Sequence, residues 1–342
     1  MSVSVSEQKR VLVVRAGALG DTLMTTPLLR ALRESSPERP IDVLCAASAA
    51  PLLERNTRVA EVLPLRYRNL PYALSPEKQR LTRTLRARGY TQAILLERRH
   101  HYRRLLERAG IESIRSFRET PFDPKTHAIV NNLRAAGLEA DGADLDMEAH
   151  WSGDDERRAK TLILELPRPL VGIHMGYGPR GKKRRQSERL KGWPLAHFVE
   201  LCQTLSHRGS SLVFTGSSED RRDVGRVTSR LSGASFANLA GRTSVCELAA
   251  LISRLDLFVS VDSGPAHLAA AVATPLVVLW GPAILEQVRP ISSRSPVVVL
   301  RHPVPCAPCY ETPLMKTCRQ NVCMESITPD EVASSAASLL SV

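Results

Sequence analysis

The residues best suited to chemistry lie in turns that follow short apolar runs. Asp262-Ser263-Gly264 follows the run 257–261, and Pro265 opens an apolar stretch with helical character, 266–272. A strand, a glycine turn and a helix start direct backbone N–H groups and the positive end of the helix dipole at one point, which suits phosphate. Asp262 beside that point can accept hydrogen bonds from hydroxyls. Phosphate and hydroxyls together favour a nucleotide sugar, whereas the simpler interpretation is an ordinary turn with Ser263 as a helix cap.

Three more charged residues follow predicted strands or precede predicted helices. Asp21 comes after Gly20 at a helix start, where a carboxylate can be a general base on a hydroxyl or merely a helix cap. Lys191 precedes Trp193 and a helix, and can neutralise a phosphate or be an ordinary surface lysine. Glu219 ends the turn after the run 211–215, where it can bind ribose hydroxyls or only favour the helix dipole.

Several motifs of other enzyme classes are missing from the sequence. It contains no Gly-x-Gly-x-x-Gly, no Gly-Lys-Ser/Thr phosphate loop and no Gly-x-Ser-x-Gly turn. Hydride transfer, phosphoryl transfer by a P-loop and serine hydrolysis therefore lose support. The acidic pair Asp144-Leu145-Asp146 lies in an expected linker, so a divalent metal holding a diphosphate is not indicated.

Four cysteines near the C-terminus are closely spaced. Cys306, Cys309, Cys318 and Cys323 form a Cys-x2-Cys-x8-Cys-x4-Cys pattern. In a chain expected to be cytoplasmic, such thiols favour a structural zinc or iron site over disulfides. The spacing is irregular for a zinc ribbon, so reduced or redox-sensitive thiols remain the alternative.

The composition narrows the possible partners. The net charge is +12, and the segment 66–104 holds 11 basic residues against 2 acidic ones. This excess suits phosphates, an acidic lipid surface or nucleic acid, or is only a solvated face. Only 4% of the residues are aromatic, which argues against base stacking and hence against a nucleic-acid partner. Without a long apolar run or a secretory signal at the N-terminus, we expect a cytoplasmic protein.

Alternating apolar runs and helical patterns predict an α/β fold with parallel sheets covered on both faces. We expect two domains, 1–165 and 166–342, with the acidic segment 131–153 leading out of the first. Ligands should bind beyond the strand C-terminal ends, in a cleft between the two sheets. The expected strands are 11–14, 41–46, 59–64, 93–96, 170–174, 211–215, 236–239, 257–261, 275–280 and 297–300. The expected helices are 22–33, 48–55, 77–88, 194–207, 220–231, 245–253, 266–272 and 328–340.

A set of short motifs in order along the chain points to one family. They are Arg15-Ala-Gly-Ala-Leu-Gly-Asp21, Lys191-x-Trp193-Pro194, Gly216-x-x-Glu219, Leu239-Ala-Gly241-Arg-Thr243, Val261-Asp262-Ser263-Gly264-Pro265-x-His267-Leu268, Gly281-Pro282, and the cysteines followed by Met324-x-x-Ile327-Thr-Pro329. Together they resemble glycosyltransferase family 9, the lipopolysaccharide heptosyltransferases. The basic loop 177–190 looks long for that family.

The resemblance implies a GT-B fold, with two Rossmann-like domains that bind the acceptor (1–165) and the nucleotide sugar (166–342). It implies inverting transfer of a heptose from ADP-heptose to the lipopolysaccharide inner core, with no cofactor required. The alternative is a relative that moves another nucleotide-activated sugar to a different glycan or protein. The expected partners are the donor, an anionic glycolipid and the cytoplasmic leaflet of the inner membrane.

The resemblance also assigns residue roles. Asp21 is the expected general base, and Arg15, Arg98 and Arg99 are candidates for binding acceptor phosphates. Lys191 is expected to hold the diphosphate and Glu219 the ribose. The remaining donor-binding residues form one continuous stretch: Asp262, Ser263, Gly264, Pro265, Ala266 and His267.

Overall fold

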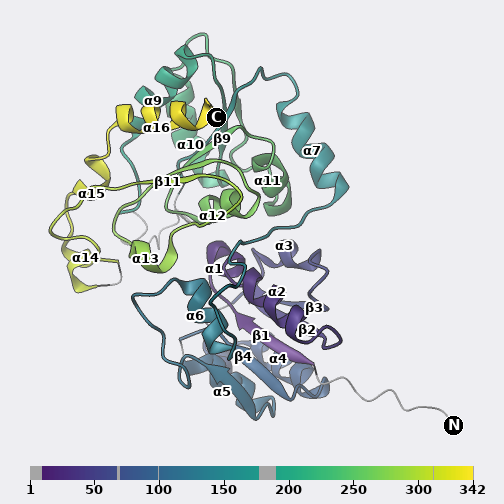
Figure 1. The fold of residues 1–342 in the computed structure, drawn as a ribbon. Coiled ribbons are helices and arrows are strands. Elements are labelled where there is room, and N and C mark those ends of the chain that lie inside the picture. Colours follow the sequence, from purple (N-terminus) through teal and green to yellow (C-terminus); the bar gives the residue numbers. More distant parts are fainter. Residues whose placement is uncertain (1–9, 68–69, 99, 177–189, 311, 342) are drawn as a thin grey trace. The chain divides into compact units, whose positions relative to one another are not determined.

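The computed structural model describes residues 10–67, 70–98, 100–176, 190–310 and 312–341 (Figure 1). Its contacts divide the chain into two compact units, Met1–His150 and Trp151–Val342. The division lies before helix α7 (Gly153–Ile163), whereas the sequence placed the domain boundary at 165/166. The helix belongs to the second unit because it contacts α11 (Val245–Ile252), and Arg254 pairs with Glu156 there.

The first unit is a five-stranded parallel sheet in the order β3-β2-β1-β4-β5. Its strands are β1 (Val11–Arg15), β2 (Ile41–Ala46), β3 (Glu61–Leu65), β4 (Gln92–Leu95) and β5 (Ser113–Ser116). Its helices are α1 (Leu19–Leu23), α2 (Thr26–Ser35), α3 (Ala50–Glu54), the 3-10 turn η1 (Tyr72–Leu74), α4 (Pro76–Ala87), α5 (His100–Arg108) and α6 (Ala128–Ala135).

Alternation along β1 divides the core of this unit into two layers. Leu12 and Val14 pack with residues of α4 and α5, whereas Val11 and Val13 pack with residues of α2, α3 and α6. Successive side chains of a strand point to opposite faces of its sheet, so both faces are covered by helices. This explains why β1 is an uninterrupted apolar run.

The second unit is a six-stranded parallel sheet in the order β11-β10-β9-β6-β7-β8. Its strands are β6 (Leu170–His174), β7 (Ser211–Thr215), β8 (Phe236–Asn238), β9 (Leu257–Val261), β10 (Leu276–Leu279) and β11 (Val297–Leu300). Besides α7 and α11, its helices are α9 (Leu195–His207), η2 (Ser218–Asp220), α10 (Arg221–Thr228), α12 (Gly264–Ala271), α13 (Leu285–Val288), α14 (Pro313–Thr317), α15 (Val322–Glu325) and α16 (Pro329–Leu340). Helix α9 contacts α10 and α16, and α11 contacts α7 and α12.

Both sheets reverse their strand order once. The chain leaves the middle of the first sheet toward β3 and resumes at β4, so the reversal lies between β1 and β4. In the second sheet it lies between β6 and β9. Open parallel sheets bind ligands beyond the strand ends at such a reversal, because loops there diverge to opposite faces. The residues that follow β1, β4, β6 and β9 are therefore the ones to examine.

The α/β class expected from the sequence is confirmed, but several elements differ. The helix expected at 22–33 is two helices, α1 and α2. Pro27 lies in the first turn of α2, where its missing N–H costs nothing, so the chain restarts a helix there. The expected linker 131–153 includes the second half of α6, which His127 caps through its ring nitrogen. Among the described residues, no helix is both long and apolar enough to cross a membrane.

Candidate functional site

Asp21 lies in the first turn of α1, directly after β1. Its carboxylate accepts from the Ala18 N–H (2.7 Å) and pairs with Arg15 (2.5 Å). Gly17 is required here, because a Cβ atom at that position would collide with the Asp21 side chain. The carboxylate is therefore held in one orientation and remains about 30% exposed. The simpler interpretation of Asp21 as the helix N-cap is wrong, because Ala18 is the N-cap and Asp21 is the third residue of α1, where its carboxylate is fixed and reachable.

Arg15 holds this carboxylate from the end of β1. Its other terminal nitrogen donates to the Leu96 carbonyl (2.5 Å), which follows the neighbouring strand β4. Burial tends to lower the pKa of Arg15, but the charges of Asp21 and Glu97 outweigh it and raise that pKa. The guanidinium therefore stays charged beside the Asp21 carboxylate. Glu97 escaped the sequence analysis, although its place behind the predicted strand 93–96 was the available signal.

Of the two other arginines predicted to bind the acceptor, the structure describes only Arg98. Arg98 is exposed in the segment after β4, and its guanidinium lies 5.2 Å from the centre of the Phe122 ring. Arg99 lies outside the described residues, as does nearly all of the basic loop 177–190. Arg15, Asp21 and Arg98 thus all belong to the segments that flank the strand-order reversal of the first unit.

In the second unit, Lys191 and Asp262 form an ion pair. The Lys191 Nζ lies 2.5 Å from an Asp262 oxygen, and the two side chains are 18% and 6% exposed. Asp262 follows β9, which borders the strand-order reversal of this sheet. The two residues are far apart in sequence, and the sequence did not predict the contact. A cation and a carboxylate are therefore fixed together where such a sheet binds its ligand.

Helix α12 begins directly after Asp262. Ser263 occupies the N-cap position, as expected, but its side chain does not accept from the helix backbone. Its hydroxyl lies instead 3.0 Å from that of Ser260, so the expected side-chain cap is not formed. Pro265 lies in the first turn and has no N–H, and Ala266 and His267 are buried in the helix. The start of α12 thus has no serine side chain bonded to its backbone, and the Ala266 N–H donates to the Ser263 carbonyl (3.2 Å).

The turn after β7 carries two acidic residues, Glu219 and Asp220, which differ in burial. Asp220 is 3% exposed and accepts from the N–H and the hydroxyl of Ser217, both at 2.7 Å. Glu219 is exposed. A Cβ atom on Gly241 would come 2.6 Å from the Ser218 Cα, so only glycine allows that loop to approach the turn. The buried aspartate fixes the turn, and its neighbour Glu219 lies on the surface of that turn.

His174 ends β6 and is a further residue that the sequence analysis missed. Its Nδ1 lies 2.9 Å from the Thr215 hydroxyl at the end of β7. Burial lowers the pKa of His174 to about 4, although the charge of Asp220 acts in the opposite direction. The ring is therefore neutral at neutral pH and joins the ends of two central strands.

Chemically, the second unit offers an ammonium group, a carboxylate and a helix start at one strand-order reversal. The family comparison is consistent with that chemistry: residues 116–318 match the model of glycosyltransferase family 9 (heptosyltransferase), which is more than half of the chain. The chain belongs to glycosyltransferase family 9. It is therefore a glycosyltransferase, as the motifs predicted.

Known members of family 9 resemble the chain over most of their length. Lipopolysaccharide heptosyltransferase 2 of Escherichia coli K12 is 26% identical over 321 residues, which cover 85% of this chain and 88% of that protein. Lipopolysaccharide heptosyltransferase 3 of Escherichia coli is 30% identical over 281 residues, covering 77% of this chain and 80% of that protein.

Solved structures confirm the GT-B fold of this family 9 glycosyltransferase. Escherichia coli ADP-heptose lipopolysaccharide heptosyltransferase II matches with a TM-score of 0.75 at 24% identity, over 97% of this chain and 98% of that one. A family 9 glycosyltransferase from Veillonella parvula matches with a TM-score of 0.81 at 20% identity, over 99% and 98%.

The four C-terminal cysteines of this glycosyltransferase are differently placed. Cys306 is exposed, Cys318 is half-buried, and Cys309 and Cys323 are buried. Burial raises the pKa of Cys309, as do the nearby Cys306 and Cys318. Burial, together with Cys309, Cys306 and Cys318, raises the pKa of Cys323 to about 11. Among the described residues, no three ligating side chains are arranged to hold a metal ion. The thiols share one neighbourhood, but they do not fit a metal as they stand.

A few basic residues of the stretch 66–104 make contacts within the fold. Lys78 donates to the Leu70 carbonyl (2.6 Å), and Arg88 and Arg103 pair with glutamates. Arg80 and Arg83 differ, because they lie on the exposed face of α4 and form no ion pair with another described side chain. Most of the described arginines of this stretch are exposed, whereas Lys78 is buried.

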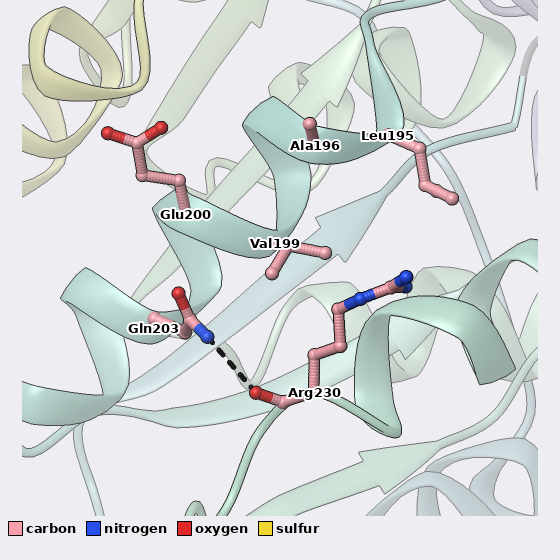
Figure 2. A pocket seen from close by; sticks show the side chains of 6 residues that line it. All are labelled: Leu195, Ala196, Val199, Glu200, Gln203 and Arg230. Atoms are coloured by element: carbon pink, nitrogen blue, oxygen red, sulfur yellow. Dashed lines mark hydrogen bonds between the residues drawn. The ribbon is translucent and has the colours of Figure 1, made fainter.

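A surface pocket of about 480 Å³ lies along α9, apart from the strand ends (Figure 2). Figure 2 shows the Gln203 side chain donating to the Arg230 carbonyl across one side of it (3.1 Å). Its lining residues are Leu195, Ala196, Val199, Glu200, Gln203 and Arg230. It includes none of the donor-binding or acceptor-binding candidates.

Proposed function

We propose that this family 9 enzyme is an inverting, metal-independent transferase that moves a heptose from ADP-heptose to the lipopolysaccharide inner core. The observation that carries the proposal is the Lys191–Asp262 pair beside the start of α12. A diphosphate needs cations and N–H donors, and a sugar needs a carboxylate for its hydroxyls. The names of the relatives supply the sugar and the acceptor, since they act as lipopolysaccharide heptosyltransferases.

The second unit is proposed to bind the donor. Lys191 and the N–H group of Gly264 at the start of α12 would bind the diphosphate. Asp262, once its lysine turns to the phosphate, would accept from the sugar hydroxyls. Glu219, exposed on its fixed turn, would accept from the ribose hydroxyls, as acidic residues do in related dinucleotide folds.

The first unit is proposed to bind the acceptor and to supply the base. As the acceptor oxygen bonds to the anomeric carbon, the bond from that carbon to the ADP oxygen breaks and ADP leaves with the electron pair. The acceptor proton passes to the Asp21 carboxylate, which the ion pair with Arg15 holds in one orientation. One displacement from the opposite side inverts the anomeric centre. Arg98, with Arg99, would bind acceptor phosphates.

Lys191 and the Gly264 N–H group would stabilise the charge that develops on ADP. We therefore propose that no cofactor takes part in the transfer. Activity that survives extensive chelation, with no gain from added Mg²⁺ or Mn²⁺, is the expected result. A structural zinc or iron at the cysteines stays a prediction, and elemental analysis of the reduced protein decides it.

An anionic glycolipid acceptor places the enzyme at a membrane surface. Tyr67 and Leu74 are 62% and 68% exposed, and Arg80 and Arg83 face solvent on α4 nearby in the sequence. We propose a cytoplasmic enzyme whose arginines contact the anionic inner-membrane leaflet peripherally. Co-sedimentation with anionic but not with neutral vesicles is the expected result.

Two variants test the chemistry directly. Asp21→Asn should lower turnover about 10²-fold or more while ADP-heptose affinity stays nearly unchanged, because the amide cannot take the proton. Lys191→Ala should weaken ADP binding in a calorimetric titration. If a panel of nucleotide sugars shows that another donor raises the melting temperature more than ADP-heptose does, the sugar assignment is wrong. If Asp21→Asn loses donor affinity as strongly as turnover, Asp21 is a structural residue.

A further inference from the structure

We propose that Tyr310, carried by the cysteine-rich segment 306–324, is a positioning residue that aligns Lys191 for the donor diphosphate. This inference rests on the proposed role of Lys191 in donor binding. Neither the motifs nor the sequence analysis singled out Tyr310. Three groups of contacts carry the inference.

The first contact joins the two side chains. The Lys191 Nζ lies 4.6 Å from the centre of the Tyr310 ring, within the distance at which a cation is attracted to an aromatic face. The same nitrogen pairs with Asp262. A lysine side chain is flexible and loses entropy when it is ordered. The ring and the carboxylate together restrict where the ammonium group can lie before any ligand arrives.

The second group of contacts fixes Tyr310. The N–H groups of Cys309 and Tyr310 both donate to the Pro282 carbonyl, at 3.0 and 2.9 Å. Pro282 follows β10, a strand next to the one that carries Asp262. Thr312 closes the turn by donating its hydroxyl to the Cys309 carbonyl (2.8 Å). The ring is thus tied to the same end of the sheet as the proposed donor site.

The third group of contacts fixes the loop around Lys191. Leu190 packs with Cys309 and Met315, and the Asn321 side-chain amide donates to the Gly192 carbonyl (2.7 Å). The cysteine-rich segment therefore holds both neighbours of Lys191. Two buried members of the segment, Cys309 and Cys323, act here as apolar packing residues, whatever else their thiols do.

The Tyr310 ring and the Asp262 carboxylate would affect Lys191 differently when the diphosphate binds. Asp262 neutralises the charge of Lys191 and must release it when the diphosphate binds. The ring of Tyr310 attracts the ammonium without carrying a net charge, so it can keep the nitrogen in place while the phosphate takes over as counter-ion. Tyr310 thereby orders Lys191 in both states, and Asp262 becomes available to sugar hydroxyls.

The test is a double-mutant cycle on the full chain, read by calorimetric titration with ADP. Tyr310→Leu should weaken ADP binding about three- to tenfold, the range expected for one cation–π contact. Tyr310→Phe keeps the ring and should bind ADP as the wild type does. In the Lys191→Ala background, Tyr310→Leu should cause no further loss, because the residue acts through the lysine.

Other outcomes overturn the proposal. An equal loss from Tyr310→Leu with and without Lys191 means that Tyr310 acts independently, as general packing would. A loss in Tyr310→Phe as large as in Tyr310→Leu assigns the effect to the hydroxyl. If Tyr310→Leu does not fold, as judged by its melting temperature, Tyr310→Met serves as the second variant without a ring. If Lys191→Ala alone binds ADP normally, the proposed role of Lys191 in donor binding is wrong. That result differs from a failure of the Tyr310 proposal, in which Lys191→Ala weakens ADP binding but the Tyr310 variants do not behave as expected.

Discussion

Replacing Glu148 tests how the end of the first unit is held in place. Its carboxylate accepts from Asn56 (2.9 Å), Arg58 (2.9 Å) and Arg30 (3.2 Å), and His150 lies 3.5 Å away. Burial tends to raise the pKa of Glu148, but the contact with His150 and the charges of Arg58 and Arg30 outweigh it. The pKa falls from 4.5 to about 2 as a result. We expect Glu148→Gln to destabilise the first unit.

The size of the effect follows from this pKa. A carboxyl group whose pKa is lower in the folded state stabilises the fold above its unfolded pKa and loses that contribution as pH falls through the folded value. A depression of this size corresponds to about 3 kcal/mol at pH 7, and about 2 kcal/mol of it is lost by pH 3. The Glu148 side chain is only 16% exposed, so solvent screens this contribution little.

The assay must report on the first unit alone. All three tryptophans, Trp151, Trp193 and Trp280, lie in the second unit, so their fluorescence serves as the control for that unit. Amide hydrogen exchange of peptides that cover β1 and β2 should show the loss in the first unit. The difference between wild type and Glu148→Gln should shrink from about 3 kcal/mol at pH 7 to about 1 kcal/mol at pH 3.

Two results would refute this reasoning. The first is a difference between wild type and Glu148→Gln that stays constant between pH 7 and pH 3. The second is an equal loss in the matched control Glu61→Gln. That control removes a glutamate paired with Arg88 that is 44% exposed, and it should cost less than about 1 kcal/mol.

Three further substitutions give separate predictions. Gly17→Ala should lower turnover at least tenfold with ADP affinity unchanged, because the new methyl group displaces the Asp21 side chain. Normal turnover would show that catalysis does not need the fixed orientation of the Asp21 carboxylate. Gly241→Ala should weaken ADP binding severalfold in calorimetry. The φ of +67° at this position is strained for alanine, and the new Cβ atom would collide with the turn that carries Glu219. Unchanged ADP affinity would show that this turn is not part of the donor site. Trp193→Phe should lower the free energy of unfolding of the second unit by about 1–2 kcal/mol in urea, because the buried hydrogen bond from the indole N–H to the Ile327 carbonyl is lost. A loss below about 0.5 kcal/mol would contradict this prediction.

The sequence predicted the buried parallel strands well. The buried strands expected at 170–174, 211–215 and 257–261 have those bounds in the structure, as does the half-buried edge strand expected at 297–300. Strands covered on both faces read as short apolar runs that end in turns, so local sequence suffices to find them. Helices α5 and α7 were missed because their charged residues hide a narrow apolar face, although Ser152 and Asp155 form a capping box that marks the start of α7.

The candidate site was only partly predictable, for a different reason. Asp21, Lys191, Glu219 and Asp262 could be singled out because each stands next to a strand end or helix start. Their partners could not, because pairs such as Lys191 and Tyr310 meet only after the chain has folded. The simpler interpretation of Ser263 as a side-chain cap was wrong because its hydroxyl lies 3.0 Å from that of Ser260 and accepts nothing from the helix backbone.

The ion pair between Lys191 and Asp262 has a consequence for ligand entry. A lone lysine would meet its ligand fully hydrated, and part of the binding energy would go into stripping that water. Here folding has already removed much of the water from the ammonium group, because a resident anion stands in for the phosphate. Donor binding then exchanges one counter-ion for another, so its affinity should vary less steeply with salt concentration than that of an exposed lysine site.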